Sequence, residues 1–478
     1  MMIRQNHALL FLLTILTCVA PLRADQRKPN FLFIYTDDQR WDTMGVVQRE
    51  QGERARFPWF KTPNMDRLAA GGLRFRNAFV TMSLCAPSRA AFLTGRYNHL
   101  NGVTNNHTPF PLDSVTHATL LRAAGYKTAY IGKWHMGLQK GQRPGFDYSA
   151  SFIGHGRYMD CPVEINGVST PTKGWIDDVD TDFAIEFMKQ NRDQPFSMVV
   201  GFKSPHSPRG GNNLPGRLRN LYTGETSRPT PNSGAHAIFS KPDPVTGKYP
   251  AGLADNNIHL DYLRHVTGAD ENLGRLLDAL DELGIADDTV VVYTSDNGYY
   301  LGEHSLGDKR SIYEESLRVP MLVRYPRLFG KGKVIDEMVL NIDLAPTFLD
   351  LAGVPASQEM QGVSWKALAA GEKPANWRQS FLAEYFYENG GGDTPTLVGV
   401  RTANAKLVKY PGHDEWTEVF DLAVDPYELK NLASDPAAVA KLIPEFDAQM
   451  KAMNYFVPTN ADKPPSLTPK TDSTNSEK

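Results

Sequence analysis

Cysteine is scarce in this chain, with three residues among 478. So few thiols exclude a fold held together by a framework of disulfide bonds. Cys18 lies in an N-terminal segment that we expect to be removed, so a mature chain keeps Cys85 and Cys161. A single bridge between these two residues is one possibility, and a buried structural role for Cys85 is another.

An excess of charge of one sign is also missing. Lysine and arginine number 51 against 54 aspartate and glutamate residues, which gives a net charge of −3. This balance offers no general attraction for nucleic acid. Any anionic substrate must therefore be held by cations placed locally in its site. The 33 prolines and 39 glycines indicate many ordered loops in a chain long enough for a large core.

Long apolar runs are absent beyond the N-terminal segment. Residues 8–20 are apolar, follow Arg4 and precede a short stretch that ends at Ala24. A run of this length predicts a secretory signal peptide over residues 1–24 rather than a membrane span. A lipid anchor on Cys18 is a weaker alternative, because the residues before it fit that modification poorly. We expect an exported protein, periplasmic or secreted, with no membrane span.

Short apolar runs alternate with helical patterns along most of the chain. Buried strands are predicted at 31–35, 128–131, 196–202 and 289–294, and helices at 116–124, 177–191 and 258–283. This alternation is typical of an α/β fold in which a large, mostly parallel sheet is sandwiched by helices. Polar groups that follow the strands then meet at one edge of the sheet, where such folds bind ligands.

The pattern changes after residue 371. Strands at 381–385, 397–401, 406–410 and 419–422, followed by a helix at 436–453, predict a smaller antiparallel sheet packed with one helix. We therefore expect a catalytic domain over 25–371, a C-terminal subdomain over 372–457 and a disordered tail over 458–478. The aperiodic segment 208–255 is too long for an ordinary loop, and we expect it to form a wall of the active-site cleft.

The most informative stretch begins at Cys85. The residues Cys85-Ala86-Pro87-Ser88-Arg89, followed by Leu93-Thr94-Gly95, resemble the signature of the sulfatase family, formylglycine-dependent enzymes of the alkaline phosphatase superfamily. The resemblance implies that a maturing, formylglycine-generating enzyme oxidises Cys85 to formylglycine, whose hydrate is the nucleophile. It also implies that Arg89 steadies this group. An unconverted thiol cannot re-form a carbonyl to expel sulfate.

Oxygen-bearing side chains follow two of the predicted strands, Asp37-Asp38 after the first and Asp296-Asn297 after the last. Oxygen ligands suit Ca²⁺ or Mg²⁺ rather than zinc. Exposed turns are the alternative for such pairs. The resemblance implies that these four residues, with the converted Cys85, bind one Ca²⁺, although Mg²⁺ is possible.

Two lysines and two histidines complete the set that the resemblance implies. Lys133 and Lys309 match the cations that contact the sulfate oxygens. His206 matches the histidine that protonates the leaving alcohol, and His135 the one that deprotonates the second hydroxyl of the hydrate. Histidine suits both tasks because its pKa lies near working pH. Each of the four side chains could instead be solvated or half-buried without a catalytic role.

The resemblance runs from Asp37 to the stretch 418–428 near the C-terminus, and it is closest to glucosamine-6-sulfatases and bacterial polysaccharide sulfatases. It implies a sulfuric ester hydrolase acting on a sulfated carbohydrate, a glycosaminoglycan or algal polysaccharide fragment, with a preference for 6-O-sulfated hexosamine. Residues near the metal motif or in the long loop are candidates for sugar contact: Tyr299, His304, Arg310, Arg209 and Asn212.

Two other functions compete with this interpretation. A phosphoester or phosphonate monoester hydrolase can share the fold, but two-metal phosphatases need further Asp and His ligands, and Asn297 stands where that set would extend. A non-catalytic carbohydrate-binding protein is the other alternative. The complete set of candidate catalytic residues argues against it.

Overall fold

Strand β1 (Asn30–Thr36) lies at the centre of the fold, and all seven of its residues are buried. The computed structural model describes residues 28–249 and 252–463. Alternate side chains of a strand point to opposite faces of the sheet. Phe31 and Phe33 accordingly pack into one hydrophobic cluster, and Leu32 and Ile34 pack into another. A continuous apolar run is therefore what this strand needs.

The large sheet has ten strands in the order β11-β2-β10-β9-β1-β8-β4-β5-β6-β7. Its centre, from β9 to β5, is parallel. Strand β10 runs antiparallel to both of its neighbours, β9 and β2, while β6 runs antiparallel to β5 and β7 antiparallel to β6. The further strands are β2 (Leu73–Phe75), β4 (Lys127–Lys133), β5 (Tyr148–Phe152), β6 (Val163–Ile165), β7 (Val168–Thr170), β8 (Phe196–Gly201), β9 (Thr289–Ser295), β10 (Met321–Arg324) and β11 (Lys333–Ile335).

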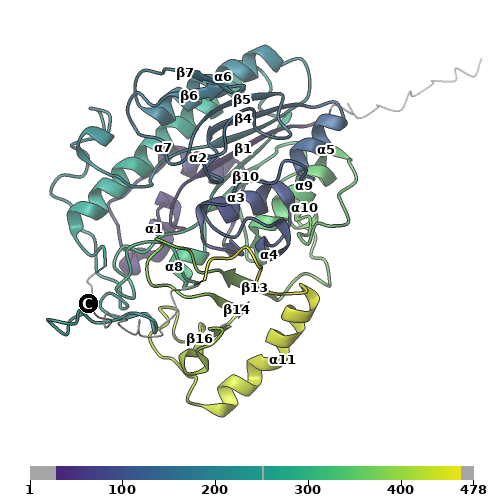
Figure 1. Ribbon diagram of the computed structural model, residues 1–478. Helices are drawn as coiled ribbons and strands as arrows, with labels where there is room; N and C mark the ends of the chain where they lie inside the picture. Colours follow the sequence, from purple (N-terminus) through teal and green to yellow (C-terminus); the bar gives the residue numbers. More distant parts are fainter. Residues whose placement is uncertain (1–27, 250–251, 464–478) are drawn as a thin grey trace, which may run out of the picture.

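Helices cover both faces of this sheet (Figure 1). One face packs against α2 (Pro63–Gly71), α6 (Ile176–Asn191) and α7 (Asn256–Glu282), and the other against α3 (Cys85–Thr94), α5 (His117–Ala123) and α9 (Leu344–Ala352). Shorter elements join them: α1 (Gly45–Gln51), η1 (Gly52–Arg54), α4 (Asn98–Asn101), η2 (Gly211–Asn213), α8 (Glu314–Leu317), η3 (Asn341–Asp343), α10 (Lys366–Ala370) and the paired β3 (Ala78–Phe79) and β12 (Val339–Leu340).

The C-terminal part forms a four-stranded antiparallel sheet. Its strands, in order, are β13 (Ser380–Tyr385), β14 (Leu397–Thr402), β15 (Ala405–Lys409) and β16 (Glu418–Asp421), with η4 (Asp414–Trp416) before the last. Helix α11 (Pro436–Ala452) packs on it through Leu442, which meets Val400 and Leu407 in one cluster. The predicted fold, a large mostly parallel sheet between helices with a small antiparallel sheet and helix, is confirmed.

Some predictions differ in detail or fall outside the described residues. The helix predicted from 116 begins at His117, because Thr116 is its N-cap and exchanges hydrogen bonds with Thr119. The signal-peptide prediction over 1–24 lies outside the described residues, as does most of the predicted disordered tail. The domain boundaries stay predictions.

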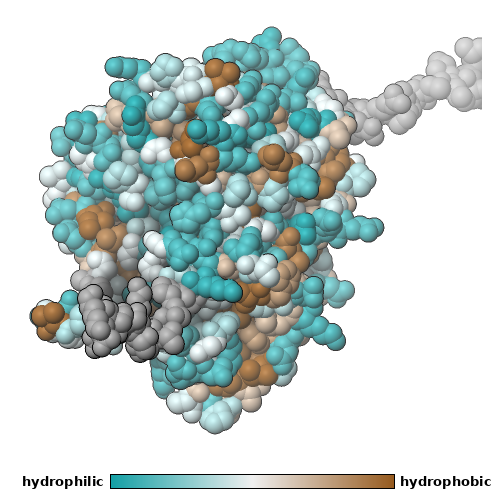
Figure 2. Space-filling model, viewed as in Figure 1, coloured by the Kyte–Doolittle hydropathy of each residue, from teal (hydrophilic) through white to brown (hydrophobic). Residues whose placement is uncertain are grey.

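The face of the molecule in Figure 2 is mostly hydrophilic, with apolar residues scattered over it. Among the described residues, no helix combines the length and apolar character needed to cross a membrane.

Candidate active site

Helix α3 places the cysteine motif. Cys85 is its first residue and is fully buried, and Gly95 ends the helix in the left-handed conformation at φ 66°. Arg89 lies four residues after Cys85 and so on the same side of the helix. The amide of Ala86 donates to Asn106 Oδ1 at 3.0 Å, which satisfies one of the free donors of the first turn. Cys85 and Cys161 are both free thiols, so the possible bridge between them is absent.

Two neighbouring strands bring the acidic residues together. Thr36 at the end of β1 pairs in parallel register with Ser295 at the end of β9, so the next residues of both strands reach the same edge. Asp37, Asp38 and Asp296 each offer a carboxylate oxygen there, and these oxygens lie within 4.8 Å of one another. Cys85 and Asp37 form a second such group with His206. All of these side chains are buried.

The donor set fits a hard divalent cation. Asn297 donates from Nδ2 to Asp38 Oδ1 at 2.7 Å, while its buried Oδ1 has no hydrogen-bond partner among the described residues. Burial and the neighbouring Asp37 raise the pKa of Asp296 to about 7, although Arg89 opposes the shift. Clustered carboxylates and a free amide oxygen are the ligands that Ca²⁺ and Mg²⁺ take in proteins.

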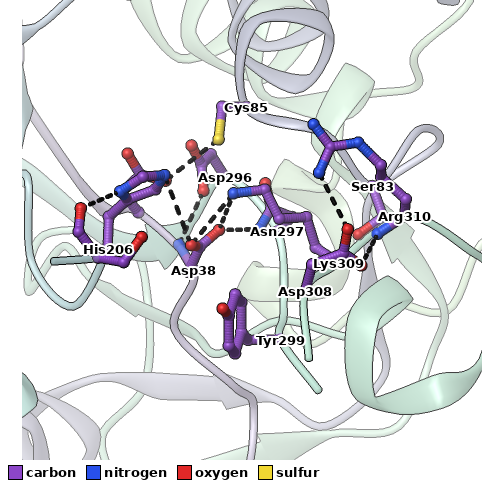
Figure 3. Close-up of polar contacts among 12 residues, drawn as sticks. Asp38, Ser83, Cys85, His206, Asp296, Asn297, Tyr299, Asp308, Lys309 and Arg310 are labelled. Carbon is purple, nitrogen blue, oxygen red and sulfur yellow. Dashed lines mark hydrogen bonds and ion pairs between the residues drawn. The ribbon is translucent and has the colours of Figure 1, made fainter. Parts of the chain in front are cut away.

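Three cations surround these carboxylates. Arg89 Nη2 lies 2.9 Å from Asp37 Oδ2 and 2.6 Å from Asp296 Oδ2. Lys133, the last residue of β4, pairs with Asp37, and Lys309 Nζ lies 2.8 Å from Asp38 Oδ1. Figure 3 shows Lys309 reaching toward Asp38 below Cys85 and Asp296. The structure thus brings the predicted acids and cations together.

The thiol of Cys85 is held in its protonated form. It donates to Asp37 Oδ1 at 3.2 Å. Burial and the charge of Asp37 raise the pKa of the Cys85 thiol far above its ordinary value. Burial acts to raise the pKa of Asp37, but the charges of Lys133 and the other nearby cations outweigh it and hold this pKa well below its usual range. A cysteine in this place is a poor thiolate nucleophile.

Three histidine rings pack together beside the carboxylates, with interplanar angles of 46° and 31°. His155 lies between His135 and His206, with ring centroids 3.8 Å and 4.7 Å away. Burial, with the charge of Lys133, lowers the pKa of both His135 and His206 well below the ordinary value. His206 Nε2 is 3.9 Å from Asp38 Oδ2. Both predicted histidines therefore lie beside these carboxylates, and their surroundings favour the neutral imidazole.

Sequence reasoning missed two residues of this group. His155 Nδ1 lies 3.3 Å from Lys133 Nζ, and Lys203 donates to the carbonyl of His155 at 2.9 Å. Burial lowers the pKa of Lys203 to about 7, and Lys133 adds to the shift. Lys203 directly follows a predicted strand, which is the signal that located the other site residues. His155 stands between two glycines and gives no comparable signal.

The candidates for sugar contact divide into two groups. Arg209 lies over the ring of Tyr299 at 4.5 Å, with Nη2 4.0 Å from Asp38 Oδ2, so this pair borders the carboxylates. Arg310 pairs with Asp308 at 3.0 Å and lies close to Lys309 in Figure 3. Asn212 is exposed in η2.

His304 belongs to a different cluster. Its buried ring stacks on Tyr313 at 3.9 Å, and Nε2 lies 3.1 Å from Asn232 Nδ2. Its proximity in sequence to the metal motif therefore does not place it beside Asp37, Asp38 and Asp296, and its ring lies near the carboxylates of Glu315 and Glu428 instead. A role in sugar contact stays a prediction for all five candidates.

The C-terminal part of the chain also reaches the site. Glu388, just after β13, accepts from the amide of Asn106 at 2.7 Å and from Arg310 Nε at 3.1 Å. Asn106 in turn accepts from Ala86, the residue after Cys85. A chain of hydrogen bonds therefore joins the C-terminal part to the first turn of α3.

Comparison with known proteins agrees with this geometry. Residues 29–354 match the sulfatase family, and residues 302–455 match the family described as N-sulphoglucosamine sulphohydrolase, C-terminal. An N-acetylglucosamine-6-O-sulfatase of Bacteroides thetaiotaomicron is 33% identical, over 88% of this chain and 85% of its own length. An ulvan-active sulfatase of Formosa agariphila is 28% identical, over 94% of this chain and 89% of its own.

A solved structure shares the fold closely. A protein in complex with its substrate D-glucosamine-2-N,6-O-disulfate superposes with a TM-score of 0.80 at 29% identity, covering 90% of this chain and 98% of that one. The matched family spans more than half of the chain and includes both acidic pairs and the cysteine motif. The chain therefore belongs to the sulfatase family and is a sulfuric ester hydrolase.

Proposed function

We propose that this enzyme removes sulfate from a sulfated carbohydrate, and that 6-O-sulfated hexosamine is its preferred unit. The observation that carries the proposal is the buried group of Lys133, Lys309 and Arg89 around the acidic residues beside Cys85. Such preorganised cations stabilise charge on sulfonyl oxygens. The choice of sugar is supported by the relative that acts as an N-acetylglucosamine-6-O-sulfatase and by the neighbour solved with a 6-O-sulfated glucosamine.

The nucleophile in this proposal is formylglycine made from Cys85. Its support is the position of Cys85 at the first turn of α3, with Sγ against Asp37 and a thiol that stays protonated. A protonated thiol cannot attack sulfur, whereas an aldehyde at this position can form a hydrate with two hydroxyl groups. The proposal requires a formylglycine-generating partner enzyme.

A divalent cation fits the same place. Asp37, Asp38, Asp296 and Asn297, with the converted residue 85, would hold one Ca²⁺, and Mg²⁺ can use the same oxygen ligands. When bound, the ion supplies positive charge that lowers the pKa of a hydroxyl beside it.

The residues of the chain then divide the remaining tasks. Lys133 and Lys309 contact the sulfate oxygens, and Arg89 fixes the carboxylates in place. Burial favours the neutral form of His135, which can accept a proton from the second hydroxyl group. His206 must carry a proton to act as the acid, and an anionic sulfate bound beside it favours the protonated imidazole. Such proton transfers contribute about 10²- to 10⁴-fold to a rate.

The proposed place of action is outside the cytoplasm. Residues 1–24 have the basic start, apolar run and small-residue end of a secretory signal. We expect a periplasmic or secreted enzyme, and N-terminal sequencing of the exported protein tests this by locating the first residue after cleavage.

Two measurements test the function. Mass spectrometry of the peptide that contains Cys85, from protein made in its native host, must show the loss of the thiol. An intact thiol in active protein contradicts the nucleophile. Desulfation of defined sulfated mono- and disaccharides must then favour 6-O-sulfated hexosamine, with Cys85→Ala as the inactive control. Faster turnover of an aryl phosphate or phosphonate than of an aryl sulfate contradicts the reaction.

A further inference from the structure

A second polar pocket lies between α1, β2, α8 and the small sheet. It has a volume of about 360 Å³, and its walls include Glu50, Arg74, Glu315 and Arg401. Figure 1 shows α1 and α8 at the junction between the large and small sheets. None of the candidate catalytic and metal residues lines this pocket. It is therefore a feature separate from the site described above.

The wall of the pocket carries more arginines than acidic residues, in a chain of net charge −3. Seven arginines line it, against four acidic residues. Most of the arginines already pair with a carboxylate: Arg40 with Asp42 at 2.8 Å, Arg401 with Glu314 at 3.1 Å, Arg74 with Glu50, Arg56 with Glu303, and Arg76 with Asp336. These pairs use three of the four acids of the wall.

Two arginines remain without such a partner. Within residues 28–249 and 252–463, neither Arg54 nor Arg318 has a carboxylate within 4.0 Å. The guanidinium of Arg318 stacks on Trp41 at 4.0 Å, and Nε donates to the carbonyl of Arg76 at 2.9 Å. Stacking and a neutral carbonyl fix the position of the Arg318 side chain, but they do not neutralise its charge.

Further donors in the wall also lack partners. The Nε atoms of Arg56 and Arg74 are buried without a hydrogen-bond partner in the described part of the chain, and both side chains are about 4% exposed. Burial, with the charges of Arg401 and Arg74 nearby, lowers the pKa of Arg318 to about 10, although Glu314 opposes the shift. Crowded guanidinium groups with free donors are stabilised when an anion enters between them.

We propose that this arginine pocket binds a tetrahedral oxyanion of the sulfate type. Arginine suits this ligand because its planar fork donates two parallel hydrogen bonds to an oxyanion. The sulfate group has two possible sources, inorganic sulfate released by the reaction or a sulfate ester elsewhere on a sulfated sugar chain. In the second case the pocket anchors the chain away from the reacting group.

Calorimetric titration of the calcium-loaded enzyme tests the pocket, with sodium sulfate in one arm and a sulfated tetrasaccharide and its desulfated form in the other. Arg54→Gln and Arg318→Gln each remove one unpaired cation, and Arg122→Gln, exposed on α5 outside the pocket, is the charge-matched control. We expect either pocket variant to weaken binding about tenfold or more, because one charge-assisted hydrogen bond contributes about that factor. The control should bind as the wild type does.

Sulfate that also binds at the catalytic centre contributes equally to all variants, so the difference between them reports on the pocket. Weakening in the sodium sulfate arm identifies the free anion as ligand, and weakening only for the sulfated tetrasaccharide identifies the chain. Unchanged affinity for both ligands in Arg54→Gln and Arg318→Gln overturns the proposal. Arg54 is exposed, so its variant tests the pocket even if Arg318→Gln folds poorly. Turnover of a small aryl sulfate by Arg54→Gln should equal that of the wild type, so this test stands apart from that of the proposed function.

Discussion

The structure makes its sharpest prediction for the loss of stability when Arg89 is replaced. Its side chain is 1% exposed and bridges Asp37 and Asp296, at 2.9 Å and 2.6 Å. Removing one partner of a buried ion pair costs about 3–5 kcal/mol, because an uncompensated charge is left behind. For a chain of 478 residues the unfolding entropy is about 1 kcal/mol per degree. Arg89→Gln should therefore lower the midpoint of thermal unfolding in chelator by about 3–5 °C.

The same variant should respond more strongly to calcium. Without the guanidinium, Asp37 and Asp296 attract a divalent cation more strongly, and each tenfold gain in affinity adds about 1.4 kcal/mol to the stability. Scanning calorimetry in chelator and in millimolar calcium measures both effects. We expect calcium to raise the midpoint of Arg89→Gln by about 1 °C or more beyond its effect on the wild type.

Arg143 supplies a matched control. It is also 1% exposed and pairs with Glu164 at 3.3 Å, outside the group of candidate metal ligands. Arg143→Gln should lose stability in chelator but gain no more from calcium than the wild type. An Arg89→Gln protein as stable as the wild type in chelator, or one whose calcium response equals that of Arg143→Gln, would refute the argument.

Three further predictions concern the cations, the backbone and the response to pH. Lys309→Ala should lower kcat/KM for an aryl sulfate by about 10²-fold or more, since it removes a preorganised charge from the sulfate oxygens, and steady-state kinetics showing wild-type activity would contradict its role. Gly132→Ala should cost about 3 kcal/mol in denaturant unfolding, because the added Cβ meets the Gly201 carbonyl oxygen at 2.1 Å, whereas Gly125→Ala, with a similar φ and open space, should cost clearly less. Burial raises the pKa of Glu418 to about 7, so at intermediate pH the folded chain keeps a proton that the unfolded chain loses. The free energy of unfolding should therefore fall as the pH rises from about 5 to about 7. Glu418→Gln should flatten this slope in unfolding curves taken across that range, and an unaltered slope would count against the assignment.

The sequence predicts the centre of the fold well because its strands are buried on both faces. Strands β1 and β9 each consist of seven buried residues, and such strands leave continuous apolar runs. The edge strand β11 and its neighbour β2 have three residues each, too few to show a period. β2 pairs with β10 and with β11, and both partners are distant from it in the chain.

The site was predictable where its residues directly follow strands. Asp37 and Asp296 do so, and parallel pairing of β1 with β9 brings them together. His155 was not predictable, because its place between two other histidine rings depends on tertiary packing. His304 shows that nearness in sequence does not fix a residue's place in the fold: the backbone turns at this residue with φ 50°, and its ring packs on Tyr313 instead of joining the nearby metal motif.

The hydrogen bonds of Glu388 have a consequence for how the protein can be divided. The two sheets are separate in topology, yet the residue that steadies Asn106 beneath the first turn of α3 comes from the C-terminal part. A fragment that ends between the sheets keeps every candidate catalytic side chain but loses this support. The unit that can be transplanted, truncated or inherited as a working enzyme therefore includes both sheets, whatever boundary the topology draws between them.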